Sequence, residues 1–196
     1  MSPRKYDQSR RAEAADATRR RIVAATYELH GEKGISATTW RDIAGRADVG
    51  LGTLFHHFPT YDDVIRACGA YTFEKHGAPT AAIFDGAETA AERLRRLVAA
   101  SANFYRGFPQ LDSIRGERSR FAALDEAFTA EEAGRRALIA KALRGTRASK
   151  RARAALFALL DFRVYHDLAA SGLSHAAAVD EITNLVLHRT AIGESK

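Results

Sequence analysis

The chain has 196 residues, of which 46% are hydrophobic and 28% are charged, and its formal net charge at pH 7 is +6. This length and apolar content suffice for a buried core, in one large domain or two smaller ones, and exclude a largely disordered chain. The single cysteine excludes an intrachain disulfide framework, and no apolar run approaches the ~20 residues of a membrane-spanning helix. We therefore expect a soluble, cytoplasmic protein that is not secreted.

The N-terminal segment is basic. Residues 1–14 are polar and charged and lack an apolar period, so we expect a flexible arm there. Residues 1–21 hold seven Lys or Arg against three acidic residues. Such a run is either a solvated tail or a contact for phosphates. From Ala15 to Lys33 the apolar positions recur at helical steps, and Gly34 suits the end of this first helix.

The next stretch, residues 38–58, predicts two short helices joined by a turn. Thr39 and Asp42 have the spacing of a capping box, which favours a helix start directly after Thr39. Residues 48–50 tolerate turn dihedrals and interrupt the helical pattern, and a second short helix follows over 51–57 before a proline. Two short helices joined in this way form a helix-turn-helix.

This stretch resembles the DNA-binding signature of the tetracycline-repressor (TetR) family of bacterial regulators. The residues that carry the resemblance are Asp42-Ile43-Ala44, Ala47-Asp48-Val49 and Gly52-Thr53-Leu54-Phe55-His56-His57-Phe58. The resemblance covers only the N-terminal third, whereas helical content and approximate length match beyond it. It implies an all-α fold, with a helix-turn-helix DNA-binding domain over 15–60 and a larger effector-binding and dimerisation domain over 61–196.

In a helix-turn-helix the second helix enters the major groove by its N-terminal end. The resemblance implies that the DNA-contacting residues are Thr39, Leu51, Gly52, Thr53, Phe55, His56, His57 and Tyr61. Gly52 would let the backbone approach closely, and Thr53 would touch a base edge or a thymine methyl. Three positions depart from the family pattern. Gly50 stands where a serine cap is common. Phe55 replaces a tyrosine, and Tyr61 replaces a frequent phosphate-binding lysine, whose contact the Tyr61 hydroxyl could still supply.

Helical spacing of apolar residues predicts six further helices, which makes about nine in total. They lie at about 61–76 and 89–106, as two helices within 110–145, as a long helix over 149–171 and as a last helix over 174–192. The long helix is apolar on nearly every face between its residues 154 and 162, and the last has a stripe of Val179, Ile182, Leu185 and Val186. We expect these two helices to form a homodimer interface as a four-helix bundle with their symmetry mates.

Aromatic residues on the middle helices lie at core spacing, and most are expected to be core. The resemblance implies an effector cavity among these helices, and the candidate ligand contacts are Phe104, Phe108, Phe121 and Tyr165. Eight Lys or Arg between residues 135 and 153 have no acidic residue among them. This run is interpreted as solvated surface, with an anionic-ligand site or second DNA site as the alternative.

No group of residues predicts catalysis or metal binding. His56 and His57 are adjacent, so their side chains diverge by ~100° on a helix and cannot chelate one ion from one face. We expect no enzyme activity, cofactor or metal. The resemblance implies a ligand-responsive DNA-binding transcriptional regulator, a repressor released from a palindromic double-stranded operator by a small molecule. The alternative is an effector-independent DNA-binding or structural interaction protein without a ligand pocket.

Overall fold

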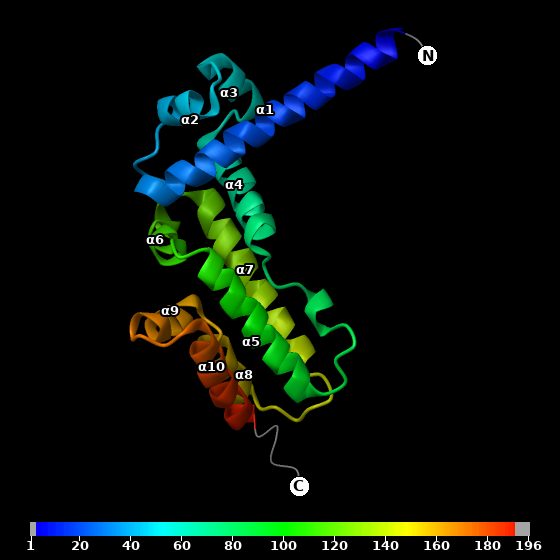
Figure 1. Ribbon diagram of the computed structural model, residues 1–196, viewed down its shortest axis with the longest axis vertical. Helices are drawn as coiled ribbons and strands as arrows, with labels where there is room; N and C mark the ends of the chain where they lie inside the picture. The colour runs from blue at the N-terminus through cyan, green and yellow to red at the C-terminus, as the bar shows by residue number, and fades with distance from the viewer. Residues whose placement is uncertain (1–2, 191–196) are drawn as a thin grey trace. The chain divides into compact units, whose positions relative to one another are not determined.

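The computed structural model describes residues 3–190, with side chains from residue 8 onward. This part of the chain contains ten α-helices, two short 3-10 helices and no strand, which confirms the all-α class (Figure 1). The helices form two compact units, one of residues up to 73 with 113–127, the other of 74–112 with the residues from 128 onward. None of the helices within 3–190 is long and apolar enough to span a membrane.

The first unit contains α1 (Pro3–Lys33), α2 (Trp40–Ala47), α3 (Leu51–His57) and the first part of α4 (Tyr61–His76). In Figure 1, α2 and α3 lie side by side against the C-terminal half of α1. The core between them is apolar and includes Ile22, Leu29, Ile43, Leu54, Phe58 and Val64. The short helices are therefore stabilised mainly by burial against α1, because isolated helices of this length are marginal in water.

The helix α1 begins well before the expected Ala15. Residues 1–14 are predicted as a flexible arm, whereas the helix runs from Pro3. Proline suits the first helical position, and no glycine or proline follows it before Gly31. The hydroxyl of Ser9 donates to Glu13 one turn on, at 3.0 Å. High helix propensity and local side-chain contacts therefore extend α1 without apolar periodicity.

The first unit also includes a segment from the middle of the chain, which the expected boundary near residue 60 does not anticipate. The segment comprises the end of α6 (Leu111–Gly116), the 3-10 helix η2 (Arg118–Arg120) and the start of α7 (Ala122–Ala142). The ring of Phe121 lies 5.8 Å from that of Tyr61, and Arg66 bonds Glu126 at 3.1 Å. Contacts between residues that are distant in sequence thus decide how the chain divides into two units.

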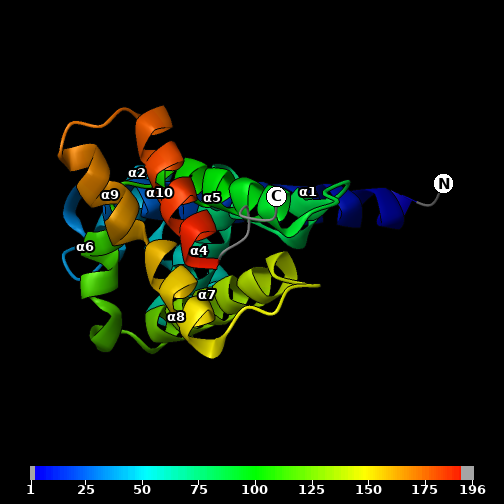
Figure 2. The same cartoon turned by 90° about the horizontal axis from the view of Figure 1, so that it is seen from below.

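The second unit contains η1 (Ala81–Phe84), α5 (Ala90–Gly107), α8 (Lys150–Leu159), α9 (Phe162–Ala170) and α10 (His175–Thr190). The helix α10 packs on α5, α8 and α9 (Figure 2). The core of this unit includes Leu94, Leu97, Val98, Leu143, Leu156, Phe162 and Val186. The last helix is described as far as Thr190, so residues 191 and 192 of its expected range lie outside the described residues.

The single long helix expected over 149–171 is wrong, because the structure divides it into α8 and α9. Asp161 caps α9, its carboxylate accepting from the Arg163 N–H at 3.1 Å. The Leu160 carbonyl, at the end of α8, accepts from the Tyr105 hydroxyl at 2.8 Å and from Arg135 at 3.1 Å. No glycine or proline marks this break. Side chains from α5 and α7 therefore satisfy the carbonyl in place of a continuing helix.

Candidate nucleic-acid interface

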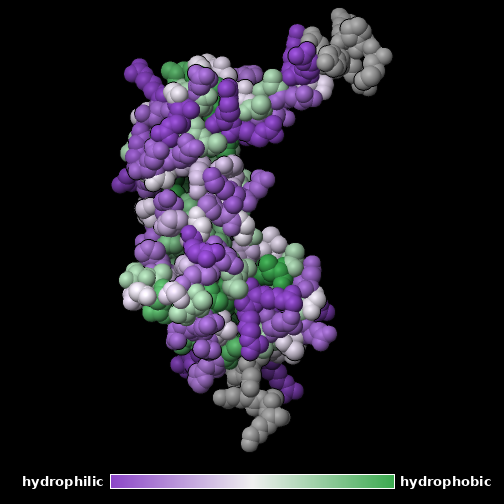
Figure 3. All heavy atoms as spheres, viewed as in Figure 1, coloured by the Kyte–Doolittle hydropathy of each residue, from purple (hydrophilic) through white to green (hydrophobic). Residues whose placement is uncertain are grey.

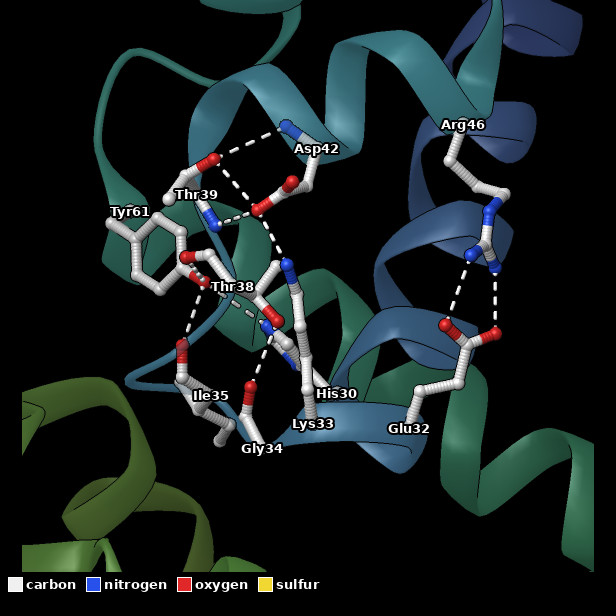
Figure 4. Close-up of polar contacts among 10 residues, drawn as sticks. All are labelled: His30, Glu32, Lys33, Gly34, Ile35, Thr38, Thr39, Asp42, Arg46 and Tyr61. Carbon is white, nitrogen blue, oxygen red and sulfur yellow. Dashed lines mark hydrogen bonds and ion pairs between the residues drawn. The ribbon is translucent and has the colours of Figure 1, made fainter.

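The predicted capping box at the start of α2 is present (Figure 4). The Thr39 hydroxyl accepts from the Asp42 N–H at 3.2 Å, and the Asp42 carboxylate accepts from the Thr39 N–H at 2.8 Å. Lys33 donates to the same carboxylate at 2.6 Å. The hydrogen bonds from Lys33 and Thr39 hold the pKa of Asp42 far below its ordinary value. The first turn of α2 is thus tied to the last turn of α1.

The turn between α2 and α3 is built as the sequence predicts. Asp48 ends α2 in the left-handed region, at φ 52°, which Asp tolerates better than most residues. Leu54 is fully buried and forms the apolar wedge under α3, with Val49 partly buried beside the same core. The turn and the wedge fix α3 with its opposite side turned to solvent.

The outer side of α3 carries most of the predicted DNA contacts. Leu51, Gly52, Thr53, Phe55 and His56 are exposed, and His57 is half-buried. Leu51 is 39% and Phe55 43% exposed, on a unit whose drawn face is otherwise mostly hydrophilic (Figure 3). A Cβ added at Gly52 would meet nothing within 4 Å. Among the described residues, none would crowd a side chain at position 52, and Leu51 and Phe55 remain exposed.

Trp40 links α2 to α3 through aromatic contacts. Its ring centroid lies 5.1 Å from that of Phe55 and 5.2 Å from that of Tyr61, both edge-on. Trp40 is partly buried against the core of the unit. The exposed ring of Phe55 is therefore supported from within, and its position depends on α2.

The hydroxyl of Tyr61 has partners inside the domain. It lies 2.9 Å from the Thr38 carbonyl, 3.1 Å from the Ile35 carbonyl and 3.2 Å from Nε2 of His30 (Figure 4). Burial raises the pKa of Tyr61 and lowers that of His30 to about 4. The hydroxyl is bonded inside the domain because the turn after α1 presents two carbonyls to it. Tyr61 thus supports the helix-turn-helix from within, and its phosphate contact stays a prediction.

The candidate ligand residues do not form one cluster. Phe104 and Phe108 are buried in the second unit with ring centroids 6.4 Å apart, whereas Phe121 belongs to the first unit. Tyr165 lines a cavity with Ser101, Tyr105, Asp161 and other residues of the second unit. The space open to the centre of a water molecule is about 10 Å³ there, room for about one water.

One member of the basic run is not a surface residue. Arg135 is only 7% exposed and donates to the Asp161 carboxylate at 2.9 Å, so it belongs to the interior of the second unit. Its neighbour Arg136 is exposed. Within residues 3–190, no group of three or more His, Cys, Asp or Glu side chains is arranged to hold a metal ion.

A capped first helix, a tight turn and a second helix with an exposed outer side define a helix-turn-helix domain. Residues 22–68 match the family described as bacterial regulatory proteins, tetR family. The match to this family covers the helix-turn-helix and its neighbouring helices, which make up about a quarter of the chain.

Relatives match part of the chain in sequence, and solved structures share its fold. The chain is 35% identical over 69 residues to the HTH-type transcriptional repressor KstR of Mycolicibacterium smegmatis, a match that covers 35% of this chain and 34% of the repressor. A transcriptional regulator from Rhodococcus sp. Rha1 has a similar fold, with a TM-score of 0.69 at 20% identity over 87% of this chain and 96% of that one. The multidrug binding protein EbrR, solved with imidazole, has a TM-score of 0.62 at 24% identity over 90% and 92%.

Proposed function

We propose that the protein is a DNA-binding transcriptional regulator that represses from a palindromic duplex operator. The observation that carries the proposal is the outer side of α3, where Leu51, Gly52, Thr53, Phe55 and His56 are exposed on a tetR-family domain. A major groove admits an α-helix and offers thymine methyls to apolar side chains and donors or acceptors to Thr and His. Repression is inferred from the relative KstR, which this chain matches over about a third of its length.

The test is selection of duplexes from a random library by the full-length protein, followed by fluorescence anisotropy on selected and random duplexes. Thr53→Ala should weaken binding to the selected duplex by about 1–3 kcal/mol and leave random duplex nearly unchanged. Thr80→Ala, at an exposed position of the second unit, is the matched control. Equal loss on both duplexes would assign Thr53 to backbone contact, and a wild-type protein that selects no sequence would contradict the proposal.

The basic N-terminal part of α1 supports a further phosphate contact. Arg4, Lys5, Arg10 and Arg11 precede the domain core, which begins at Ile22. Deleting residues 1–14 should flatten the dependence of log affinity on log salt concentration, because fewer counterions are released on binding. The same slope before and after the deletion would leave these cations without a part in DNA binding.

We also propose a homodimer through α8 and α10, within the ranges 149–171 and 174–192. Ile182 and Val186 are buried within their own chain, so the partner-facing side is a different one, with Leu185 41% exposed and Ala158 exposed. Leu185→Asp should therefore produce monomers of unchanged helix content in sedimentation and circular dichroism, whereas Ile182→Asp should unfold the unit. A wild-type protein that sediments as a monomer at micromolar concentration would contradict the dimer.

Release by a small-molecule effector is the remaining part of the proposal, with Phe104, Phe108 and Tyr165 as candidate contacts. The fold resembles that of EbrR, whose description names multidrug binding. The second candidate is an effector-independent DNA-binding protein, in keeping with the small size of the one cavity described at Tyr165. A metabolite library screened against binding to the selected duplex separates them, because only a responsive regulator loses affinity with at least one compound.

A further inference from the structure

The turn between α1 and α2 receives a carboxylate from a distant part of the chain. The Ile35 N–H donates to Oε1 of Glu117 and the Ser36 N–H to Oε2, each at 2.8 Å. The turn and Glu117 both belong to the first unit. Two successive backbone N–H groups directed at one carboxylate form an anion-binding nest.

Gly34 makes this nest possible. Its φ of +84° is a left-handed conformation that other residues adopt at a cost, and it turns the two following N–H groups toward Glu117. A Cβ added at Gly34 would lie 3.0 Å from Oε1 of Glu117, closer than side chains tolerate without moving. Arg120 adds a third tie, because its guanidinium donates to the Ser36 hydroxyl at 3.1 Å. The nest is thus shaped for an anion, and the Glu117 carboxylate of the same chain occupies it.

The protonation of Glu117 agrees with this geometry. Burial by itself would raise the pKa of Glu117, but the hydrogen bonds from Ser36 and Ile35 outweigh burial and the pKa lies below its ordinary value. The carboxylate is therefore ionised at neutral pH, the form that accepts from both N–H groups.

The same turn leads directly into the DNA-reading helices. Backbone carbonyls of this turn also have partners. The Tyr61 hydroxyl bonds the Ile35 and Thr38 carbonyls, and the Thr38 hydroxyl donates to the Gly34 carbonyl at 2.8 Å. Thr39, the next residue, caps α2. Because α3 packs on α2, the path of this short turn sets where both helices lie on α1.

We infer that Glu117 is a positioning residue for the helix-turn-helix, which holds α2 and α3 in their reading geometry through the Gly34–Ser36 nest without touching DNA. This inference rests on the proposed DNA-binding function. Its expected consequence is selective. Loss of the carboxylate should loosen the geometry that base contacts need, while phosphate contacts tolerate the change because they carry little geometric or sequence information.

The experiment compares full-length Glu117→Gln and Gly34→Ala with wild type on the selected and random duplexes. Glutamine has the shape of glutamate but offers one acceptor oxygen and one amide nitrogen, which cannot accept from the second N–H. Both variants should bind the selected duplex about tenfold more weakly and the random duplex within about twofold of wild type. The control Glu126→Gln removes a carboxylate of the same unit, exposed and paired with Arg66, and should change neither affinity by more than about twofold.

Trp40 supplies a second readout that needs no DNA. It is the only tryptophan of the chain and begins α2, so its fluorescence reports on the helix that the nest positions. Glu117→Gln should change Trp40 emission or its quenching by acrylamide at temperatures where circular dichroism shows an intact fold, and Glu126→Gln should not.

The outcomes separate the two claims. If wild type selects a sequence but Glu117→Gln binds it within twofold, or if random duplex is lost equally, the positioning role is overturned. If wild type selects no sequence, the proposed function fails, and unchanged Trp40 fluorescence in Glu117→Gln would then overturn the positioning role on its own. A Gly34→Ala variant that does not fold leaves the decision to Glu117→Gln.

Discussion

The turn after α1 and the break between α8 and α9 solve the same problem with opposite chemistry. In each, the backbone leaves a helix and its polar groups need partners. After α1, the N–H groups meet the Glu117 carboxylate and the carbonyls meet Tyr61. After α8, the Leu160 carbonyl meets the Arg135 guanidinium and the Tyr105 hydroxyl. In both places one charged side chain and one tyrosine come from elsewhere in the sequence.

The two places differ in burial. The Arg135 side chain is 7% exposed and its partner Asp161 22%, whereas Glu117 is half-buried and Ser36, one of its donors, is exposed. Breaking a buried charge pair leaves a charge without water, but a half-exposed pair can exchange its partner for solvent. The comparison teaches that the α8–α9 break is part of the core of its unit, while the turn after α1 can change geometry without loss of the fold.

The largest effect is expected at the buried pair. Arg135→Met should lower the free energy of unfolding by about 3–5 kcal/mol, because Asp161 and Glu131 remain without their cation. Arg136→Met is the matched control, since the Arg136 guanidinium also lies 4.1 Å from the Phe157 ring centroid but its side chain is exposed, and it should cost less than about 1 kcal/mol. Urea denaturation followed by circular dichroism measures both. A similar loss of unfolding free energy in the two variants would contradict the expectation that the buried pair matters more to stability than the exposed one.

The next largest effect is a loss of stability at acid pH, which is expected from His30, a buried histidine beside the turn after α1. Burial lowers the pKa of His30 from 6.5 to about 4, so between these values the unfolded chain binds a proton that the folded chain does not. Stability should therefore fall as the pH is lowered through this window, by up to about 3 kcal/mol for a shift of this size.

Measuring the free energy of unfolding between pH 7 and pH 4.5 tests this expectation. His30→Gln should flatten the profile, and His188→Gln, at an exposed position of α10, should leave it unchanged. Carboxylates whose pKa is lowered, such as Glu117, lose their contribution only as the pH falls below the ordinary carboxyl range. The upper part of the window therefore reports on histidines, chiefly on His30, with contributions of the same sign from His76 and His175, whose pKa values burial also lowers. A wild-type profile that is flat from pH 7 to pH 5 would contradict the buried neutral histidine.

The smallest effect is expected at the exposed cap of α2. Thr39→Ala removes the hydroxyl that accepts from the Asp42 N–H and should lower the free energy of unfolding by about 1 kcal/mol. Thr39 is also a predicted DNA contact, so fluorescence anisotropy with the selected and random duplexes tests whether it contributes to DNA binding as well as to stability. A loss of affinity for both selected and random duplexes would indicate a phosphate contact in addition to the cap. Unchanged stability would show that the backbone N–H of residue 39 and Lys33, which both donate to the Asp42 carboxylate, hold the start of α2 without the hydroxyl.

The sequence by itself determined the helix-turn-helix, because its signals are local. The Thr39–Asp42 capping box and the turn at Asp48 each depend on residues within one or two helical turns, and each is present in the structure. The same holds for α5, which begins after the cap at Thr89 as the pattern predicts. Local backbone hydrogen bonding and helical periodicity are properties of a short segment, so a short segment reveals them.

Only the tertiary structure decided where polar groups find distant partners. Glu117 meets the turn after α1 across 82 and 81 residues, and no local pattern singles it out. Tyr61 is a predicted phosphate contact, and its hydroxyl bonds two carbonyls of that turn inside the domain. The break at Leu160 has neither glycine nor proline, and Arg135 and Tyr105 stabilise it from other helices. A buried polar group must be satisfied wherever the fold brings a partner, and which partner arrives depends on packing that periodicity does not encode.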